Sequence, residues 1–175
     1  MLSGRELSRE EIETIWSIDR SEVIDAVYYF EQGALVLKPE HYDLHTWPSG
    51  EPEKYAPLLA ECFEQGGWFY GLFDGAQLAG IAVLENRLMG SPQDQLQLKF
   101  LQLGRAFRGQ GHGRRLFELA KTVARERGAK RLYISATPSE HTIGFYFSMG
   151  CVVTAEPDPE LFALEPEDIH LECSL

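Results

Sequence analysis

The chain has 175 residues, a length that favours one domain spanning residues 1–175. Apolar residues make up 44% and charged residues 25%, which excludes a disordered, collagen-like or coiled-coil protein. The longest apolar stretch, Leu78–Leu84, is too short to span a bilayer, and charged residues stand near the N-terminus where a secretory signal needs apolar ones. We therefore expect a cytoplasmic protein without a membrane partner.

The charge distribution along the chain is uneven. The whole chain has a net charge of −11, which repels nucleic acid. From Lys99 to Arg131 there are ten basic and two acidic residues, a local charge of +8, whereas the remainder has six basic and 25 acidic residues, or −19. This basic segment fits a site for a small, strongly anionic ligand, and a solvated helix face explains it as well.

The cysteines and histidines do not indicate a metal site. Cys62, Cys151 and Cys173 are an odd number without metal-ligand spacing, which favours free thiols in a reducing compartment. His141 and His170 have no second ligand at a suitable spacing. We expect no metal.

The N-terminal part is predicted to be mainly helical. Ser8 and Glu11 have the spacing of a capping box at the start of a first helix. Val23, Val27 and Phe30 stand at helical spacing and favour a second helix that starts at Ser21 and ends before Gly33. A short strand at 35–37 and a loop over 41–52 follow.

A helix and an antiparallel hairpin are predicted next. Apolar residues recur at i, i+3, i+4, i+7 and i+8 from Tyr55 to Phe63, the pattern of an amphipathic helix. Asp74-Gly75 lies between two apolar runs, which predicts strands over 68–73 and 77–84 joined by a type I′ turn.

The strand after this hairpin changes its alternation. Leu96, Leu98 and Phe100 alternate with polar residues, and Leu101 and Leu103 then continue in the opposite phase. Such a slip indicates a β-bulge, where backbone groups lose their partners and can face a ligand. A strand end buried on both faces explains the pattern equally well.

The remaining chain completes a mixed sheet. The predicted elements are a helix over 113–128, a strand over 132–136, a helix from Thr137-Pro138-Ser139-Glu140 to Met149 with Thr137 as N-cap, and closing strands at 152–153 and 169–171. This order indicates an α+β fold with one β-loop-α-β unit at its centre.

A glycine-rich loop, Arg108-Gly109-Gln110-Gly111-His112-Gly113-Arg114, precedes the helix over 113–128. Alternating glycines let the backbone approach a ligand, and a helix N-terminus attracts a pyrophosphate. Arg108 and Arg114 would add charge-assisted hydrogen bonds. The glycine spacing fits neither the dinucleotide-binding pattern Gly-x-Gly-x-x-Gly nor the P-loop, which disfavours a dinucleotide-binding or P-loop nucleotide-binding protein. The alternative is a glycine-rich turn that binds no ligand.

The pattern Arg-x-x-Gly-x-Gly at Arg108, Gly111 and Gly113, between a strand and an amphipathic helix, resembles motif A of the GNAT N-acetyltransferases. The segment Phe145–Cys151 is similar to their second signature, an aromatic-Tyr pair four residues before Gly. The resemblance implies a central mixed, mostly antiparallel sheet that splays into a V after the bulged strand and is flanked by helices. It also implies a cofactor-binding core at about 94–151 and acetyl-coenzyme A as co-substrate.

The resemblance further implies roles for individual residues. The splayed strand would bind the pantetheine amides through its backbone, the glycine loop would bind the pyrophosphate, and Tyr146 would protonate the departing thiolate. A phenol suits that task because its pKa is close to that of a thiol, although a purely structural core aromatic is the alternative. The implied cofactor-binding residues are Leu101, Gln102, Leu103, Arg108, Gly109, Gln110, Gly111, His112, Gly113, Arg114 and Ser139.

Two positions depart from the family pattern. Ser139 stands where many members have Asn, seven residues before the tyrosine. The bulged strand lacks the usual glutamate, so the general base is left open among Glu22, Glu85, Asp94 and water.

The sequence thus predicts an acyltransferase that moves an acetyl group to a primary amine by direct attack in a ternary complex. The acidic remainder suits a cationic acceptor such as a polyamine, an aminoglycoside or a lysine side chain, and solubility explains the acidity as well. The resemblance allows a homodimer. The alternative is a non-catalytic acyl-coenzyme A sensor, favoured by the missing carboxylate and disfavoured by Tyr146.

Overall fold

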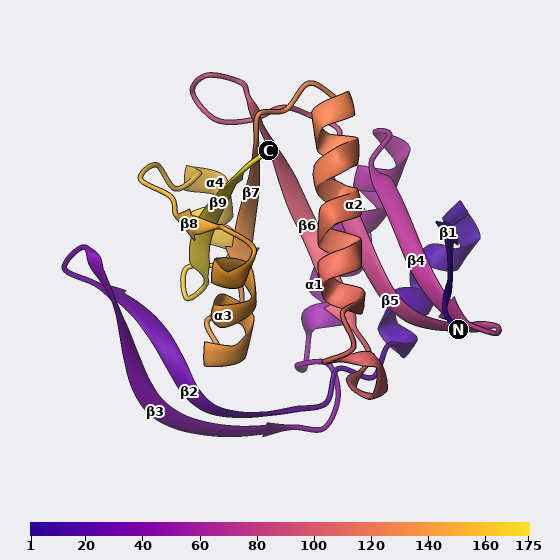
Figure 1. Ribbon diagram of the computed structural model, residues 1–175, viewed down its shortest axis with the longest axis horizontal. Coiled ribbons are helices and arrows are strands. Elements are labelled where there is room, and N and C mark those ends of the chain that lie inside the picture. Colours follow the sequence, from indigo (N-terminus) through magenta and orange to yellow (C-terminus); the bar gives the residue numbers. More distant parts are fainter.

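The computed structural model describes residues 1–175 as an α+β fold with two sheets (Figure 1). The larger sheet has seven strands in the order β1 (Ser3–Glu6), β4 (Trp68–Asp74), β5 (Gln77–Leu84), β6 (Gln95–Leu103), β7 (Arg131–Ala136), β9 (Ile169–Ser174) and β8 (Val152–Val153). All neighbouring pairs are antiparallel except β6 and β7, which are parallel. The predicted fold class is confirmed.

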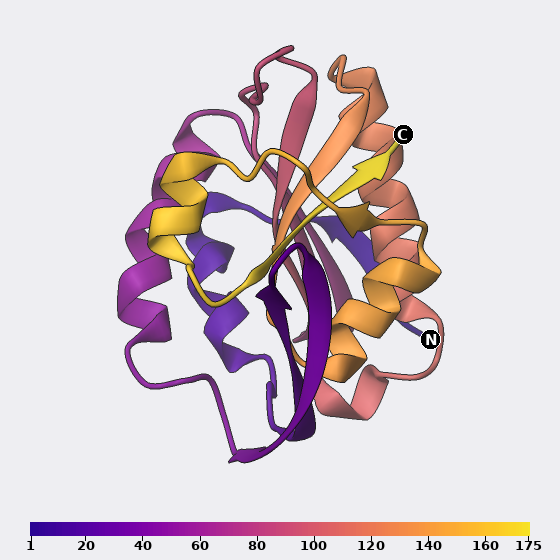
Figure 2. The same ribbon diagram turned by 90° about the vertical axis from the view of Figure 1, so that its left-hand side faces the viewer.

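Helices cover both faces of this sheet (Figure 2). On one face lie α2 (His112–Glu126) and α3 (Glu140–Ser148), over a core cluster that includes Leu116, Ala82 and Leu98. On the other face lie α1 (Glu51–Glu64) and the 3-10 helix η1 (Arg9–Ser17), over a second cluster. No helix is both long and apolar enough to cross a membrane.

The sheet opens between β6 and β7. These two strands pair only from Gln95 to Gln97, opposite Arg131 to Tyr133, and then diverge in a V (Figure 1). The predicted splay is therefore confirmed. It leaves the second half of β6 without a neighbour on one side.

The predicted bulge is confirmed, one residue earlier than the alternation suggested. Val83 faces Phe100 and Leu84 faces Leu98, so Lys99 is the extra residue in β6. Leu98 belongs to the core under α2, whereas Phe100 belongs to the core under α1. The phase thus changes before Phe100.

The helix predicted from Ser21 to the residue before Gly33 is wrong. This segment forms strand β2 (Glu22–Glu31), which pairs with β3 (Ala34–Leu44) in a separate hairpin. The turn residues Gln32 and Gly33 have φ of 50° and 82°, as a type I′ turn requires. Of the three residues at helical spacing, Val27 is buried, but Val23 is 48% and Phe30 55% exposed, so they do not form one buried face. β-Branched and aromatic residues favoured the strand here.

The remaining helical predictions need smaller corrections. The capping box is present, with Ser8 N donating to Glu11 Oε2 at 2.9 Å, and it starts a 3-10 helix. The loop predicted over 41–52 is partly wrong, because β3 continues to Leu44 and α1 starts at Glu51. Ser139, not Thr137, caps α3 by accepting a hydrogen bond from Thr142 N at 3.2 Å.

The 68–84 hairpin is confirmed, but its two loop residues are Gly75 and Ala76, and only Gly75 has positive φ (58°), so the turn is not type I′. Prediction missed strand β1, the one-turn 3-10 helix η2 (Arg105–Phe107) and helix α4 (Pro159–Leu164). The other helices and strands lie where they were predicted, with ends moved by a few residues.

Candidate active site

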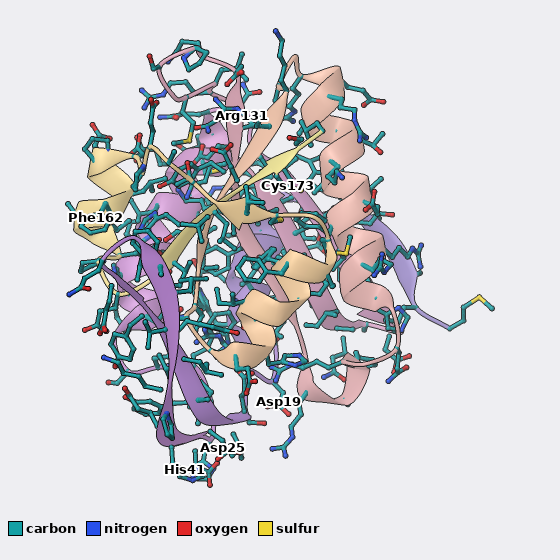
Figure 3. All side chains as sticks on the ribbon, turned by 60° about the vertical axis from the view of Figure 1, so that its left-hand side comes forward. Asp19, Asp25, His41, Arg131, Phe162 and Cys173 are labelled. Carbon is teal, nitrogen blue, oxygen red and sulfur yellow. The ribbon has the colours of Figure 1, made fainter.

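A cavity of about 1540 Å³ lies where β6 and β7 separate. Its walls come from the hairpin β2–β3, the glycine loop, α3, the start of α1 and the segment from α4 to β9. Figure 3 shows Asp25 and His41 together at the lower end of this hairpin and Phe162 on α4, where it lines the cavity. Single-ligand pockets usually occupy 300–1,000 Å³, so this cavity has room for two substrates.

Ten of the twelve predicted site residues line this cavity. The other two are Gln110, whose side chain donates to Ala106 O at 2.8 Å, and His112. Both nevertheless contribute backbone N–H groups to the glycine loop.

The open edge of β6 presents unpaired backbone groups. Gly104 N donates to Ala79 O at 2.8 Å, which fixes the alternation of hydrogen bonds between β5 and β6. Gln102 pairs with Ile81 in that ladder, whereas Leu101 and Leu103 turn their backbone groups toward the split. Leu101 therefore offers an N–H and a C=O to an amide ligand, and the backbone of Gln102 does not.

The glycine loop forms an anion-binding concavity. None of the six successive N–H groups from Gly109 to Arg114 donates to a protein acceptor; the first helical hydrogen bond runs from Arg115 N to Gly111 O at 3.0 Å. Gly109 and Gly111 have φ of 72° and 83°, a conformation that other residues rarely adopt. Such a row of free donors at the start of α2 suits a pyrophosphate.

The two arginines of the loop have different surroundings. Arg108 donates from Nε to Leu103 O at 3.0 Å and from Nη1 to Ser21 O at 3.1 Å, and burial lowers its pKa. Arg114 lines the cavity with no hydrogen bond or ion pair to the protein. The guanidinium of Arg114 is thus available to an anionic ligand, whereas Arg108 mainly joins the end of β6 to the start of β2.

Tyr146 reaches the cavity from α3. Its side chain is 6% exposed, and its ring packs edge-on against Phe117 and Phe145, with centroids 5.9 and 5.2 Å away. The hydroxyl forms no hydrogen bond with the protein, yet the residue lines the cavity. Burial raises the pKa of Tyr146, so the phenol keeps its proton at neutral pH and can donate it.

Ser139 also lines the cavity, but its hydroxyl is engaged. It donates to Thr142 Oγ1 at 2.9 Å in addition to capping α3. A hydrogen bond from Ser139 to a ligand therefore requires this side chain to exchange partners.

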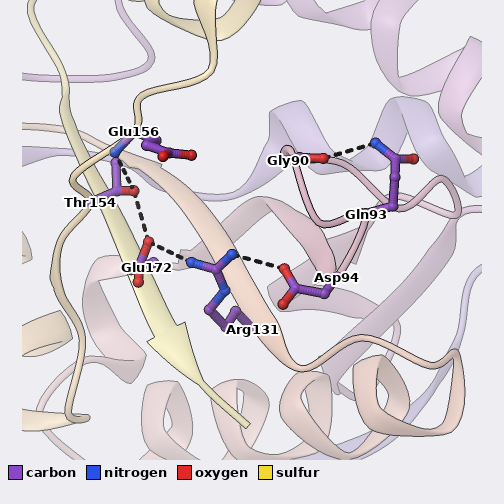
Figure 4. Close-up of polar contacts among 7 residues, drawn as sticks. All are labelled: Gly90, Gln93, Asp94, Arg131, Thr154, Glu156 and Glu172. Carbon is purple, nitrogen blue, oxygen red and sulfur yellow. Dashed lines mark hydrogen bonds and ion pairs between the residues drawn. The ribbon is translucent and has the colours of Figure 1, made fainter.

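Only one of the three carboxylates considered as general base faces the cavity. Asp94 pairs with Arg131 at 2.8 Å, at the far end of β6 (Figure 4). Glu85 pairs with Lys99 at 2.6 Å, outside the cavity lining. Glu22 does line the cavity, close enough to Arg108 to influence its pKa.

Sequence reasoning missed a second group of acidic residues, on the wall formed by α1 and the segment before β9. Glu51 pairs with Arg20 at 2.9 Å, and Glu165 accepts a hydrogen bond from the Tyr55 hydroxyl. Asp168 accepts from Ser135 Oγ at 3.1 Å, and burial raises the pKa of Asp168 to about 7. The available signal was a run of acids directly ahead of a buried strand.

Comparison with known proteins agrees with this geometry. The family model described as "Acetyltransferase (GNAT) family" matches residues 36–151, about two thirds of the chain. The chain belongs to the GNAT acetyltransferase family. The resemblance inferred from the glycine loop and from the Tyr146 segment is thereby confirmed.

Several solved structures share this GNAT fold. A nourseothricin acetyltransferase has 21% identity and a TM-score of 0.71, over 99% of this chain and 98% of that one. A putative streptothricin acetyltransferase from Bacillus anthracis, in complex with acetyl coenzyme A, has 16% identity and a TM-score of 0.70, over 100% and 99%. The PaiA N-acetyltransferase from Thermoplasma acidophilum, in complex with coenzyme A, has 18% identity and a TM-score of 0.67, over 100% and 99%. No curated protein matches significantly.

Proposed function

We propose that this GNAT acetyltransferase moves the acetyl group of acetyl-coenzyme A to a primary amine of a cationic small molecule, with a lysine side chain as the less favoured acceptor. The observation that carries the proposal is that one cavity contains both the free N–H groups of the glycine loop and the unpaired hydroxyl of Tyr146. A pyrophosphate site and a proton donor are thus connected by an open strand edge.

The donor half of the cavity fits coenzyme A. The loop from Gly109 to Arg114 would hold the pyrophosphate, and Leu101 would bind a pantetheine amide. The donor supplies a thioester whose carbonyl carbon accepts the amine. An N–H of the β6 edge near Leu103 would stabilise the oxyanion, and Tyr146 would donate its proton to the departing sulfur.

The acceptor half of the cavity is richer in acids. The lining of the whole cavity contains seven acidic and five basic residues: Glu22, Glu40, Glu51, Glu140, Glu165, Glu167 and Asp168 against Arg20, Lys54, Lys99, Arg108 and Arg114. The two arginines of the glycine loop lie at the donor end, whereas Glu51, Glu165 and Asp168 gather near α1 and β9. This separation complements an anionic donor and a cationic acceptor.

The names of two similar structures add weight to a small-molecule acceptor. These names refer to nourseothricin and streptothricin. The sequence identities of 21% and 16% show only that the fold is shared. The acceptor assignment therefore depends on the acidic wall, by which we mean Glu51, Glu165 and Asp168 near α1 and β9. The names make small cationic molecules the first acceptors to test.

The test combines binding and turnover in one sample. Acetyl-coenzyme A is titrated calorimetrically, and free thiol is then followed on adding streptothricin, kanamycin, spermidine or a lysine-containing peptide. We expect saturable binding and thiol release with at least one small cationic amine. Binding without release from any amine favours the acyl-coenzyme A sensor, and no binding contradicts the donor assignment.

A further inference from the structure

The acidic wall contains one carboxylate placed to take part in the reaction. Building on the proposed acetyl transfer, we propose that Asp168 is the general base that removes a proton from the acceptor ammonium. Asp168 lies between α4 and β9, outside the bulged strand on which a base was sought.

Asp168 is held where the sheet opens. Ser135, near the end of β7, donates from Oγ to Asp168 Oδ2 at 3.1 Å, just beyond the residues that still pair with β6. Asp168 is near enough to Tyr146 to contribute to its raised pKa, and both residues line the same cavity. The base and the phenol that protonates the departing thiolate would therefore act on one reacting centre.

Of the other carboxylates at or near this wall, Glu51 and Glu165 already have partners, and Glu167 is exposed to solvent. Glu51 forms an ion pair with Arg20, and Glu165 accepts the Tyr55 hydroxyl. Asp168 accepts only the Ser135 hydroxyl, so Oδ1 has no partner in the protein. An ammonium group entering the cavity finds in Asp168 an acceptor that is neither neutralised nor saturated.

The charges around Asp168 suit proton transfer near neutral pH. It is surrounded by Glu165 directly after α4, Glu51 and Tyr55 from α1, Arg20 ahead of β2 and Tyr146 from α3. Burial, Glu165 and Glu51 raise the pKa of Asp168 to about 7, against the opposing effects of Ser135 and Arg20. A base is most effective when its pKa is near the working pH.

The proton balance closes without another reactant. Asp168 takes one proton from the ammonium, and the neutral amine forms the C–N bond to the thioester carbonyl carbon. As the C–S bond breaks, sulfur takes a proton from Tyr146, and the nitrogen's second proton returns to the phenolate through water. Asp168 then releases its proton to solvent, so each transfer liberates one proton.

The test is the pH dependence of turnover in Asp168→Asn, measured with the fastest amine of the panel above. We expect kcat/KM for the amine to fall about 100-fold at pH 7, with the Kd for acetyl-coenzyme A within twofold of the wild type. The deficit should shrink about tenfold per pH unit toward pH 9, because the free amine itself then becomes abundant. Glu160→Gln, which removes an exposed acid of α4 outside this cavity, is the matched control.

Ser135→Ala separates a base from a merely structural carboxylate. It keeps Asp168 but removes the hydrogen bond that stabilises its charge, so the acidic limb of the pH profile should move to higher pH. Glu22→Gln tests the rival carboxylate of the cavity.

The outcomes distinguish this inference from the proposed function. If the wild type releases no thiol with any amine, the acetyl transfer itself fails and Asp168 loses its role with it. If the wild type turns over and Asp168→Asn keeps its rate and its acidic limb, or Glu22→Gln removes that limb, Asp168 is not the base.

Discussion

Arg108 Nε donates to the carbonyl oxygen of Leu103 at 3.0 Å, so the first arginine of the glycine loop holds the end of the splayed strand. The same guanidinium reaches Ser21 O at 3.1 Å, just before β2. One side chain thus joins the loop, the open edge and the hairpin that closes the cavity. We therefore expect Arg108 to support cofactor binding through its position as much as through its charge.

Replacing Arg108 by Met should weaken coenzyme A binding about tenfold, because two carbonyl groups lose a donor and the β6 edge loses its support. Arg108→Lys should not restore binding, since an ammonium cannot reproduce the two directed N–H groups. Calorimetry measures both. Arg115→Met removes an exposed arginine of α2 outside the cavity and should bind normally; equal Kd values for the Arg108 and Arg115 variants would contradict the positioning role.

Replacing Tyr146 by Phe should lower kcat about 100-fold while leaving the Kd for acetyl-coenzyme A nearly unchanged. The hydroxyl has no protein partner, so its removal should also leave the melting temperature almost unaffected. Steady-state kinetics and thermal unfolding give the two readouts.

Tyr133→Phe is the matched control for this variant. The Tyr133 hydroxyl is 2.7 Å from His170 Nδ1 and accepts from Asp158 N at 2.9 Å, outside the cavity. Its loss should lower stability by about 1–2 kcal/mol and leave kcat unchanged, the reverse of Tyr146→Phe. Unaltered turnover of Tyr146→Phe at every pH would remove the tyrosine from the mechanism.

Local patterns in the sequence predicted the structural features to which we assign donor binding. The glycine loop and the phase slip of β6 each depend on a few neighbouring residues, so the sequence contains their full signal. Strand β2 was mistaken for a helix because Val23, Val27 and Phe30 also fit helical spacing, whereas pairing with β3 determines its conformation.

The acceptor half could not be predicted from local patterns. Glu165 meets Tyr55 across 110 positions of sequence, and Asp168 meets Ser135 across 33. Partners this far apart in the sequence leave no local periodicity. The raised pKa of Asp168 comes mainly from its burial, which the sequence around it does not show. The sequence therefore left the general base open among Glu22, Glu85, Asp94 and water, whereas the base that we propose, Asp168, lies in the segment before β9.

The raised pKa of Asp168 should make folding stability depend on pH. In the folded protein this carboxyl has a pKa of about 7, against 3.8 as its ordinary value, so folding favours its protonated form. The resulting stabilisation is complete below pH 3.8 and is lost as the pH rises to about 7. Each pKa unit corresponds to about 1.4 kcal/mol, so the shift sets an upper bound of about 4.5 kcal/mol on this stabilisation.

Asp168→Asn should abolish this dependence and be more stable than the wild type above pH 7. Urea unfolding at pH 5 and pH 8 measures the difference, with Glu160→Gln as the control for removing one negative charge. Parallel losses of stability in the wild type and in Asp168→Asn would show that the carboxyl is not perturbed.

Replacing Gly111 by Glu should abolish retention on a coenzyme A resin. Gly111 caps α2 with φ of 83°, beside the free N–H groups that would bind the pyrophosphate, so Glu adds both backbone strain and a repelling charge. Gly128→Glu is the matched control, because Gly128 has φ of 87°, has open space around its Cα and follows the opposite end of the same helix. We expect the Gly128 variant to be somewhat destabilised and fully retained. Retention of both variants would place the pyrophosphate elsewhere, whereas loss of both would trace the effect to strain.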